Sequence, residues 1–146
     1  MFTRILVPLD GSDKSFEALE VAYDMAEKFD AEVFLISVFK HYSFMEGSLS
    51  MFKGDTAPGN IEDALRIHSK EIVGEGKEIL QAKGLSKIRG FVKMGSAAKE
   101  ILKFSKAHKI DLIIIGSKGE GELSGYLLGG VSHKVTGLAK CPVLVI

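Results

Sequence analysis

Short apolar runs alternate with amphipathic segments along this chain, and this alternation constrains the fold more than any other feature of the sequence. Four runs have the length of buried strands, at residues 4–9, 33–38, 112–115 and 143–146. Residues 88–94 alternate apolar and polar side chains, as a strand near a sheet edge does. Helical spacing of apolar residues fills the intervals. Strands that alternate with helices indicate a parallel sheet with helices on both faces, a three-layer α/β/α domain.

Four helices are expected between these strands. The first follows an N-cap at Ser12, and the third follows Gly95-Ser96. The second runs from Ile61 to Lys83, and close packing against the sheet would explain Gly74 and Gly76 inside it. The apolar positions that define the helices are Phe16, Leu19, Tyr23 and Ala26, then Ile61, Leu65, His68, Ile72 and Ile79, then Ala98, Ile101, Leu102 and Ser105, and finally Val131, Val135 and Leu138.

The expected strand order brings two distant parts of the sequence together. Five parallel strands of this kind commonly take the order 3-2-1-4-5, or the related order 2-1-3-4-5. In the first order, strands 1 and 4 are neighbours, and ligands bind in the crevice outside their carboxyl ends. Asp10 ends strand 1 and Gly116 ends strand 4. Both therefore point to one ligand crevice.

A glycine-rich segment joins the fourth strand to the last helix. It reads Gly116-Ser117-Lys118-Gly119, then nine residues, then Gly129-Gly130. Bare backbone N–H groups beside a helix N-terminus favour anions, and a side chain at the glycine pair would hold a phosphate away from the amides. The segment is not a Walker A motif, because no Gly-Lys-Ser/Thr closes it, and it does not follow the first strand as a dinucleotide fingerprint does. A glycine-rich turn can also be present only because the backbone turns tightly. The nine-residue spacing before the Gly129-Gly130 pair favours phosphate binding.

Other polar residues are candidates for ligand binding, metal binding or catalysis. The Asp10 carboxylate could accept hydrogen bonds from a ribose or an exocyclic amine, or it could cap the first helix. The histidines have no metal-ligand spacing, and His133 is expected to be a solvated helix residue. Ser117 and Ser124 lack the partners of a nucleophile. We expect Cys141 to be a small buried residue. No catalytic residue and no metal ligand is predicted.

Composition narrows the class of protein. The 146 residues suit a single domain, 1–146, and lysine plus arginine equals aspartate plus glutamate at 19 each. No bulk charge therefore attracts nucleic acid or an acidic membrane. No apolar run approaches the ~20 residues of a spanning helix. A single cysteine excludes an intrachain disulfide, and no signal-peptide pattern follows Met1, so a cytoplasmic location is expected.

Two segments suggest partners. Residues 40–60 form a long unperiodic stretch with aromatic residues and methionines, which fits a lid, a docking surface for an unidentified protein, or a tolerated insertion packed on the body. Residues 143–146 are apolar and expected at a sheet edge. Pairing with the same strand of a second copy would cover that edge, which predicts a homodimer.

Three stretches together resemble the universal stress protein family over essentially the whole chain. They are Ile5-Leu6-Val7-Pro8-Leu9-Asp10-Gly11-Ser12, Asp111-Leu112-Ile113-Ile114-Ile115-Gly116-Ser117 and Cys141-Pro142-Val143-Leu144-Val145-Ile146. Gly116, Gly119 and Gly129 match the spacing found in the family's ATP-binding members. The resemblance implies a Rossmann-like fold of the adenine nucleotide alpha hydrolase type. It also implies a homodimer that acts in the stress response.

The resemblance further implies an adenine nucleotide in the crevice. Its base and ribose would lie near Pro8, Leu9, Asp10, Val38 and Ile115. Its phosphates would lie on Gly116, Gly119 and Gly129 and on the amides of Gly130 and Val131.

The chain departs from the family pattern at two positions. Gly130 stands where the family has Ser or Thr, so one hydroxyl contact to phosphate is lost, and Ser132 is the residue expected to compensate. A hydrogen bond to a charged group contributes about 1.5–3 kcal/mol, so affinity would fall about ten- to a hundredfold without compensation. Ala97 stands where the family often has proline, which affects helix initiation only.

Three functions remain open from the sequence. The first is a homodimeric sensor or regulator that binds ATP, ADP or AMP, with or without Mg²⁺, and hydrolyses ATP slowly at most. The second is a Mg²⁺-dependent phosphotransfer enzyme, for which Asp10, Asp13, Glu120 and Glu122 are the available carboxylates. The third is a nucleotide-free interaction module that docks partners through residues 40–60.

Overall fold

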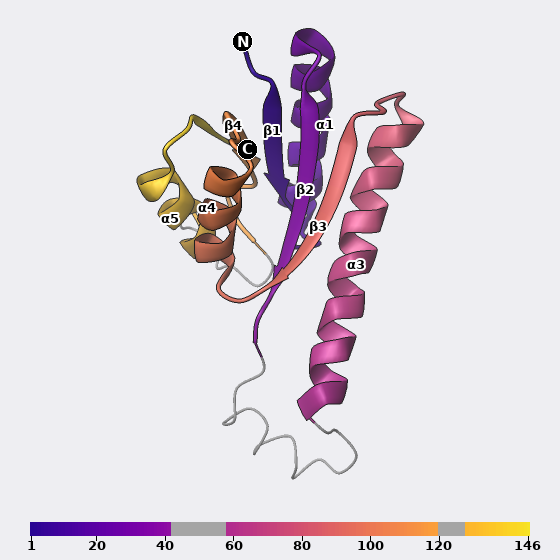
Figure 1. Ribbon diagram of the computed structural model, residues 1–146, viewed down its shortest axis with the longest axis vertical. Helices are drawn as coiled ribbons and strands as arrows, with labels where there is room; N and C mark the ends of the chain where they lie inside the picture. The colour runs from indigo at the N-terminus through magenta and orange to yellow at the C-terminus, as the bar shows by residue number, and fades with distance from the viewer. Residues whose placement is uncertain (42–57, 120–127) are drawn as a thin grey trace.

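The computed structural model describes residues 1–41, 58–119 and 128–146, with the backbone alone described at 58–60. Strands and helices alternate through these ranges, as Figure 1 shows. The elements are β1 (Arg4–Pro8), α1 (Asp13–Phe29), β2 (Glu32–Phe39), α3 (Pro58–Ala82), β3 (Ile88–Met94), α4 (Ala97–Ala107), β4 (Leu112–Ile115), α5 (Gly130–Leu138) and β5 (Val143–Val145).

The strands form one parallel sheet in the order β3-β2-β1-β4-β5, and the alternative order 2-1-3-4-5 is thereby excluded. The central strand is β1, in which Ile5 lies opposite Val33 of β2 on one side and Leu112 of β4 on the other. The chain winds outward from β1 to β3 and then returns to place β4 beside β1. This reversal opens a crevice at the carboxyl ends of β1 and β4.

Helices cover both faces of the sheet, and each face has its own core. Alternate residues of a strand point to opposite faces, so Ile5 and Val7 pack with α1 and α3, whereas Leu6 packs with α4 and α5. In Figure 1, α3 lies on one side of the strands and α4 and α5 on the other. The predicted three-layer α/β/α arrangement is confirmed.

Helix α3 differs from its prediction in its start and in its buried face. It begins at Pro58, three residues before the expected Ile61, in keeping with the preference of proline for a first helical turn. His68 was assigned to the apolar stripe, but it is exposed. The side chains that the helix buries are Ser69, Ile72, Val73 and Leu80. Ile72 was predicted correctly and Ile79 packs against the same core, so the buried stripe overlaps the predicted one and extends to Ser69, Val73 and Leu80.

The two glycines in α3 have different surroundings. A Cβ at Gly76 would lie 2.7 Å from Leu9 Cδ1, so a larger residue would force the buried Leu9 side chain to shift. A Cβ at Gly74 would meet nothing within 4 Å. Close packing thus explains Gly76 and does not explain Gly74.

Charges are unevenly distributed between the two helical layers. Helices α1 and α3 carry ten carboxylates against five cationic side chains, whereas α4 and α5 carry four lysines against one carboxylate. The zero net charge of the sequence therefore hides an acidic layer and a basic layer. None of the helices described here combines the length and apolar character that crossing a membrane requires.

Candidate functional site

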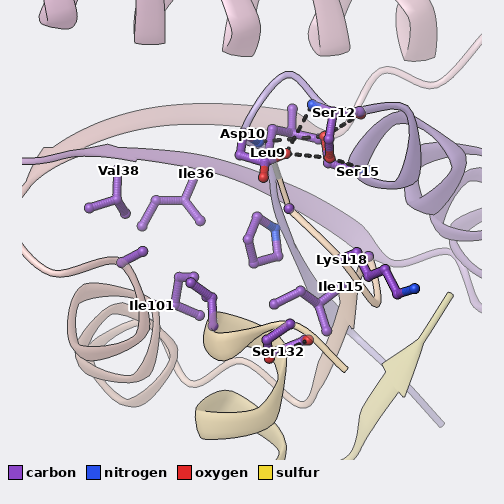
Figure 2. Close-up of a pocket in the computed structure, with 16 residues that line it drawn as sticks. Leu9, Asp10, Ser12, Ser15, Ile36, Val38, Ile101, Ile115, Lys118 and Ser132 are labelled. Carbon is purple, nitrogen blue, oxygen red and sulfur yellow. Dashed lines mark hydrogen bonds between the residues drawn. The ribbon is translucent and has the colours of Figure 1, made fainter. Parts of the chain in front are cut away.

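A pocket opens at the carboxyl ends of β1 and β4, where the winding of the sheet reverses. It is a crevice that opens to solvent and is lined by both apolar and polar residues. Its walls come from β1, β2, β4, the N-terminal turns of α1, α4 and α5, and the start of the glycine loop (Figure 2). The two sequence signals at Asp10 and Gly116 therefore do meet in one crevice.

Nearly all of the residues assigned to the ligand from the sequence line this pocket. They are Pro8, Leu9, Asp10, Val38, Ile115, Gly116, Gly119, Gly129, Val131 and Ser132. Gly130 does not belong to the lining; it is the exposed first residue of α5.

The structure adds residues that sequence reasoning missed. They are Ser12, Ser15, Ile36, Ala97, Ile101 and Lys118. Ile36 could have been predicted from the sequence, because it lies two positions before Val38 on the same face of a strand. Lys118 lies inside the glycine segment itself. Ala97 and Ile101 are brought to the pocket only by the packing of α4, and no local signal marks them.

One end of the pocket is apolar. Ile36 and Val38 of β2 lie there with Ile101 of α4, and Figure 2 shows them grouped away from Lys118. Ile36 is fully buried and Ile101 is 2% exposed, so this wall is fixed by the core of the α4 and α5 face. The surface suits a flat, largely apolar group.

The opposite end is formed by the glycine segment and the N-terminus of α5. Gly129 occupies the N-cap and has no side chain to satisfy the first amides of the helix. An N-terminus of this kind attracts anions. Lys118 also lines the pocket, and Figure 2 shows it on the side away from Ile36, Val38 and Ile101. The chemistry of this end suits a phosphate.

Backbone hydrogen bonds hold both ends of the glycine segment. The Ser117 amide donates to the Ile146 carbonyl at 2.6 Å, and the Gly129 amide donates to the Ser117 carbonyl at 2.6 Å. The start of the loop is thus fastened to the strand after α5 and to the N-cap of α5. Residues 120–127 between them lie outside the described structure.

The Ser132 hydroxyl is directed to the protein main chain. It donates to the Ser117 carbonyl at 2.8 Å and to the Gly129 carbonyl at 3.1 Å, and the residue is 3% exposed. A hydroxyl has one proton, and these carbonyls engage it. The compensation that we expected from Ser132 for the missing hydroxyl at Gly130 is therefore not what this geometry provides.

The Asp10 carboxylate contacts the residue that caps α1. Its Oδ1 accepts hydrogen bonds from the Ser12 amide at 3.0 Å and from the Ser12 hydroxyl at 2.5 Å. Ser12 then accepts from the Ser15 amide at 3.2 Å, which confirms the predicted N-cap. Through these bonds Asp10 orients Ser12, the N-cap residue of α1. The Asp10 side chain remains exposed at the pocket rim.

Glycine is required at position 116 for a steric reason, in addition to its place in the pocket lining. A Cβ there would lie 2.9 Å from the backbone carbonyl carbon of Lys14. Real Cβ contacts do not come this close, and the backbone of α1 cannot yield as a flexible side chain would. The end of β4 and the first turn of α1 therefore need glycine at this position to form the pocket wall.

The remaining candidates lie away from the pocket or outside the described residues. His133 is exposed on α5. Cys141 is half-buried, and burial raises the pKa of its thiol. Among the described residues, no three histidine, cysteine, aspartate or glutamate side chains gather as a metal site. Glu120, Glu122, Ser124 and the segment 42–57 fall in the ranges that are not described.

Comparison with known proteins agrees with this architecture. A universal stress protein of Methanocaldococcus jannaschii is 36% identical, over an alignment that covers 100% of this chain and 82% of the relative. The solved structure of the universal stress protein UspA from Lactobacillus plantarum superposes with a TM-score of 0.86 at 24% identity, covering 99% of this chain and 97% of that one.

Two similar structures contain adenine nucleotides. A universal stress protein in complex with cAMP has a TM-score of 0.70 at 23% identity, covering 99% of this chain and 96% of that one. One from Archaeoglobus fulgidus in complex with dAMP has a TM-score of 0.69 at 20% identity, covering 99% and 98%. The model of the universal stress protein family matches residues 1–146. The chain therefore belongs to the universal stress protein family.

Proposed function

We propose that this protein binds an adenine nucleotide in the pocket between β1 and β4 and acts as a homodimeric sensor or regulator in the stress response. The observation that carries the proposal is the division of one pocket into an apolar end at Ile36, Val38 and Ile101 and an anion-attracting end at Lys118 and the α5 N-terminus. An adenine nucleotide has the same two chemical ends.

Related proteins support the choice of adenine. Members of the same fold contain cAMP or dAMP, both of which carry one phosphate. The departure at Gly130 and the engaged Ser132 hydroxyl remove two hydroxyl donors from the phosphate end. We therefore propose that this chain holds its ligand through backbone amides and Lys118, and that ATP, ADP and AMP differ less in affinity than they would with a hydroxyl present.

Magnesium would enter with the phosphates. Mg²⁺ usually binds through one or two carboxylates together with substrate phosphates, and Asp10 is the described carboxylate that lines the pocket. Asp13 follows it in the first turn of α1. We propose slow ATP hydrolysis at most, because Asp10, the described carboxylate that lines the pocket, already accepts two hydrogen bonds from Ser12. A cytoplasmic site of action belongs to the same proposal.

The first test is chromatography of the nucleotide that the purified protein releases on denaturation, followed by calorimetric titration with ATP, ADP and AMP. We expect about one adenine nucleotide per chain, or binding of added nucleotide at micromolar to millimolar concentration. If the purified protein contains no nucleotide and does not bind added nucleotide at millimolar concentration, the proposed nucleotide-binding function is excluded. The interaction module then becomes the favoured function.

A variant pair isolates the glycine segment. Gly119→Val places a branched side chain in the pocket lining and should abolish nucleotide binding. Gly137→Val, on the exposed side of α5 where a Cβ meets nothing within 4 Å, should leave binding unchanged. Equal affinities for the two variants would contradict the proposed phosphate site. Mg²⁺-dependent turnover well above background would favour the phosphotransfer enzyme.

A further inference from the structure

A second groove lies at the amino ends of β4 and β5, whereas the proposed nucleotide pocket lies at the carboxyl ends of the strands. It is formed where α4 and α5 end and where the chain enters β4 and β5, and it is open to solvent. Its lining is Leu102, Lys103, Ser105, Lys106, Lys109, Ile110, Leu138, Lys140 and Cys141. The function proposed above does not use this groove.

The rim of the groove is strongly cationic. Four of its side chains are lysines, and the structure records no ion pair between any of them and another described residue. The C-termini of α4 and α5 together carry roughly one negative charge from their dipoles, so four ammonium groups exceed what the helix ends can neutralise. The nearby Asp111 carboxylate already accepts hydrogen bonds from Thr3 and Arg4.

The floor of the groove is apolar. Ile110 is 7% exposed and forms its base, whereas Leu138 is 63% exposed and stands open to solvent. The Ser105 hydroxyl donates to the Leu102 carbonyl at 2.8 Å and is already engaged. An occupant would therefore need negative charge at its edges and an apolar group at its centre.

We infer that this groove, called here the lysine groove, docks an acidic protein segment that carries a large apolar side chain. Carboxylates of the segment would pair with the rim lysines, and its apolar side chain would cover Leu138 and Ile110. Lys103 and Lys106 are three positions apart on α4 and project from one face. Acidic residues at a similar spacing in the partner would match them.

Two other classes of partner fit less well. A nucleic-acid site would be expected to offer arginine or aromatic side chains for stacking, and the lining contains neither. A membrane surface would need a wider apolar face to insert, and Leu138 is the one strongly exposed apolar side chain of the groove.

The test is fluorescence anisotropy with a short labelled peptide of glutamates around two central leucines. The wild-type protein should bind it with an affinity that falls as salt is raised. The double variant Lys103→Glu/Lys106→Glu should lose about tenfold or more, because two attractive contacts become repulsive. The control Lys99→Glu/Lys134→Glu makes the same charge change on the same two-helix layer, outside the groove, and should lose much less.

A second comparison tests the apolar floor. Replacing the leucines of the peptide with serine, or Leu138 with serine, should weaken binding, whereas Ile67→Ser on exposed α3 should not. Absence of peptide binding by the wild type would overturn the inference. So would equal losses in the two double variants, or preferred binding of phosphatidylserine vesicles or an oligothymidine strand over the peptide. The peptide experiment does not depend on nucleotide binding, which is measured separately. Failure of the groove proposal and failure of the pocket proposal can therefore be distinguished.

Discussion

Asp111 fastens the start of the first strand to the turn before β4. Its Oδ2 accepts hydrogen bonds from the Thr3 amide at 2.9 Å and the Thr3 hydroxyl at 2.8 Å, and its Oδ1 accepts from the Arg4 amide at 3.1 Å. Burial alone would raise the pKa of this carboxyl. The hydrogen bonds from Thr3 and Arg4 outweigh burial, and the pKa is lowered from its ordinary value.

A lowered pKa predicts the direction of a pH effect. The ionised carboxylate contributes stability above the unfolded-state pKa of about 3.9, and this contribution is lost as the pH falls through the lower folded-state pKa. Asp111→Asn should therefore lower the free energy of unfolding by about 1–2 kcal/mol at neutral pH and by less at acid pH. Urea denaturation at both pH values measures the difference. Asp63→Asn on the exposed part of α3 is the control, and an Asp111 effect that does not change with pH would contradict the role.

Single residues also show where sequence reasoning ends. Pro8, Leu9 and Val38 could be placed at the site because strand ends and family spacing mark them. The direction of the Ser132 hydroxyl could not, because it depends on how the Ser117 carbonyl lies after the chain turns. Asp10 was assigned to the right region, but its choice of Ser12 as a partner depends on local geometry that a spacing pattern does not contain.

Helix α3 supplies a matched pair of substitutions two residues apart. Gly74→Ala should raise the free energy of unfolding by about 1 kcal/mol, because a Cβ there meets nothing and alanine is the better helix former. Gly76→Ala should lower it by about 1–3 kcal/mol, because the new methyl group would press on Leu9. Chemical denaturation measures both changes.

The same pair reports on the pocket. Leu9 lines the pocket, so displacing it should weaken nucleotide binding in Gly76→Ala and leave Gly74→Ala unaffected. Stabilisation by both alanines would mean that α3 can move away from the sheet without cost.

Elements were predicted well where their signal is local. Uninterrupted apolar runs identified the strands, and β3 was correctly placed near an edge by its alternation. The buried face of α3 was predicted in part: Ile72 is buried as expected, but His68 is exposed. The helix also turns Ser69, Val73 and Gly76 to the sheet, which the apolar pattern did not indicate. Small residues carry little hydrophobic signal, yet they decide how closely a helix can pack.

Strand β5 is an edge strand of the sheet, paired with β4 on one side only. The Ile146 amide and the Pro142 carbonyl point to β4, since they bond Ile115 and Ile113. By alternation, Leu144 faces β4 in the same way, and the amides of Val143 and Val145 face the outer edge. The proposed homodimer would use this outer edge.

A proline can distinguish the two edges of β5. Val145→Pro removes an amide from the outer edge and should convert the dimer to monomers with little change in circular dichroism. Leu144→Pro removes an amide that faces β4 and should destabilise the fold itself. Sedimentation velocity gives the oligomeric state of each. A wild-type monomer, or a Val145→Pro protein that stays dimeric, would exclude this edge as the interface.

The unequal charge of the two helical layers has a consequence for how the whole protein behaves in an electric field. Ten carboxylates against five cations on α1 and α3, facing four lysines against one carboxylate on α4 and α5, amount to a large permanent dipole moment in a protein of zero net charge. Its sequence pI of about 6.9 suggests weak retention on any ion exchanger at neutral pH. We expect instead that at low ionic strength it is retained on both anion and cation exchangers, each binding the opposite layer, and elutes from both at modest salt.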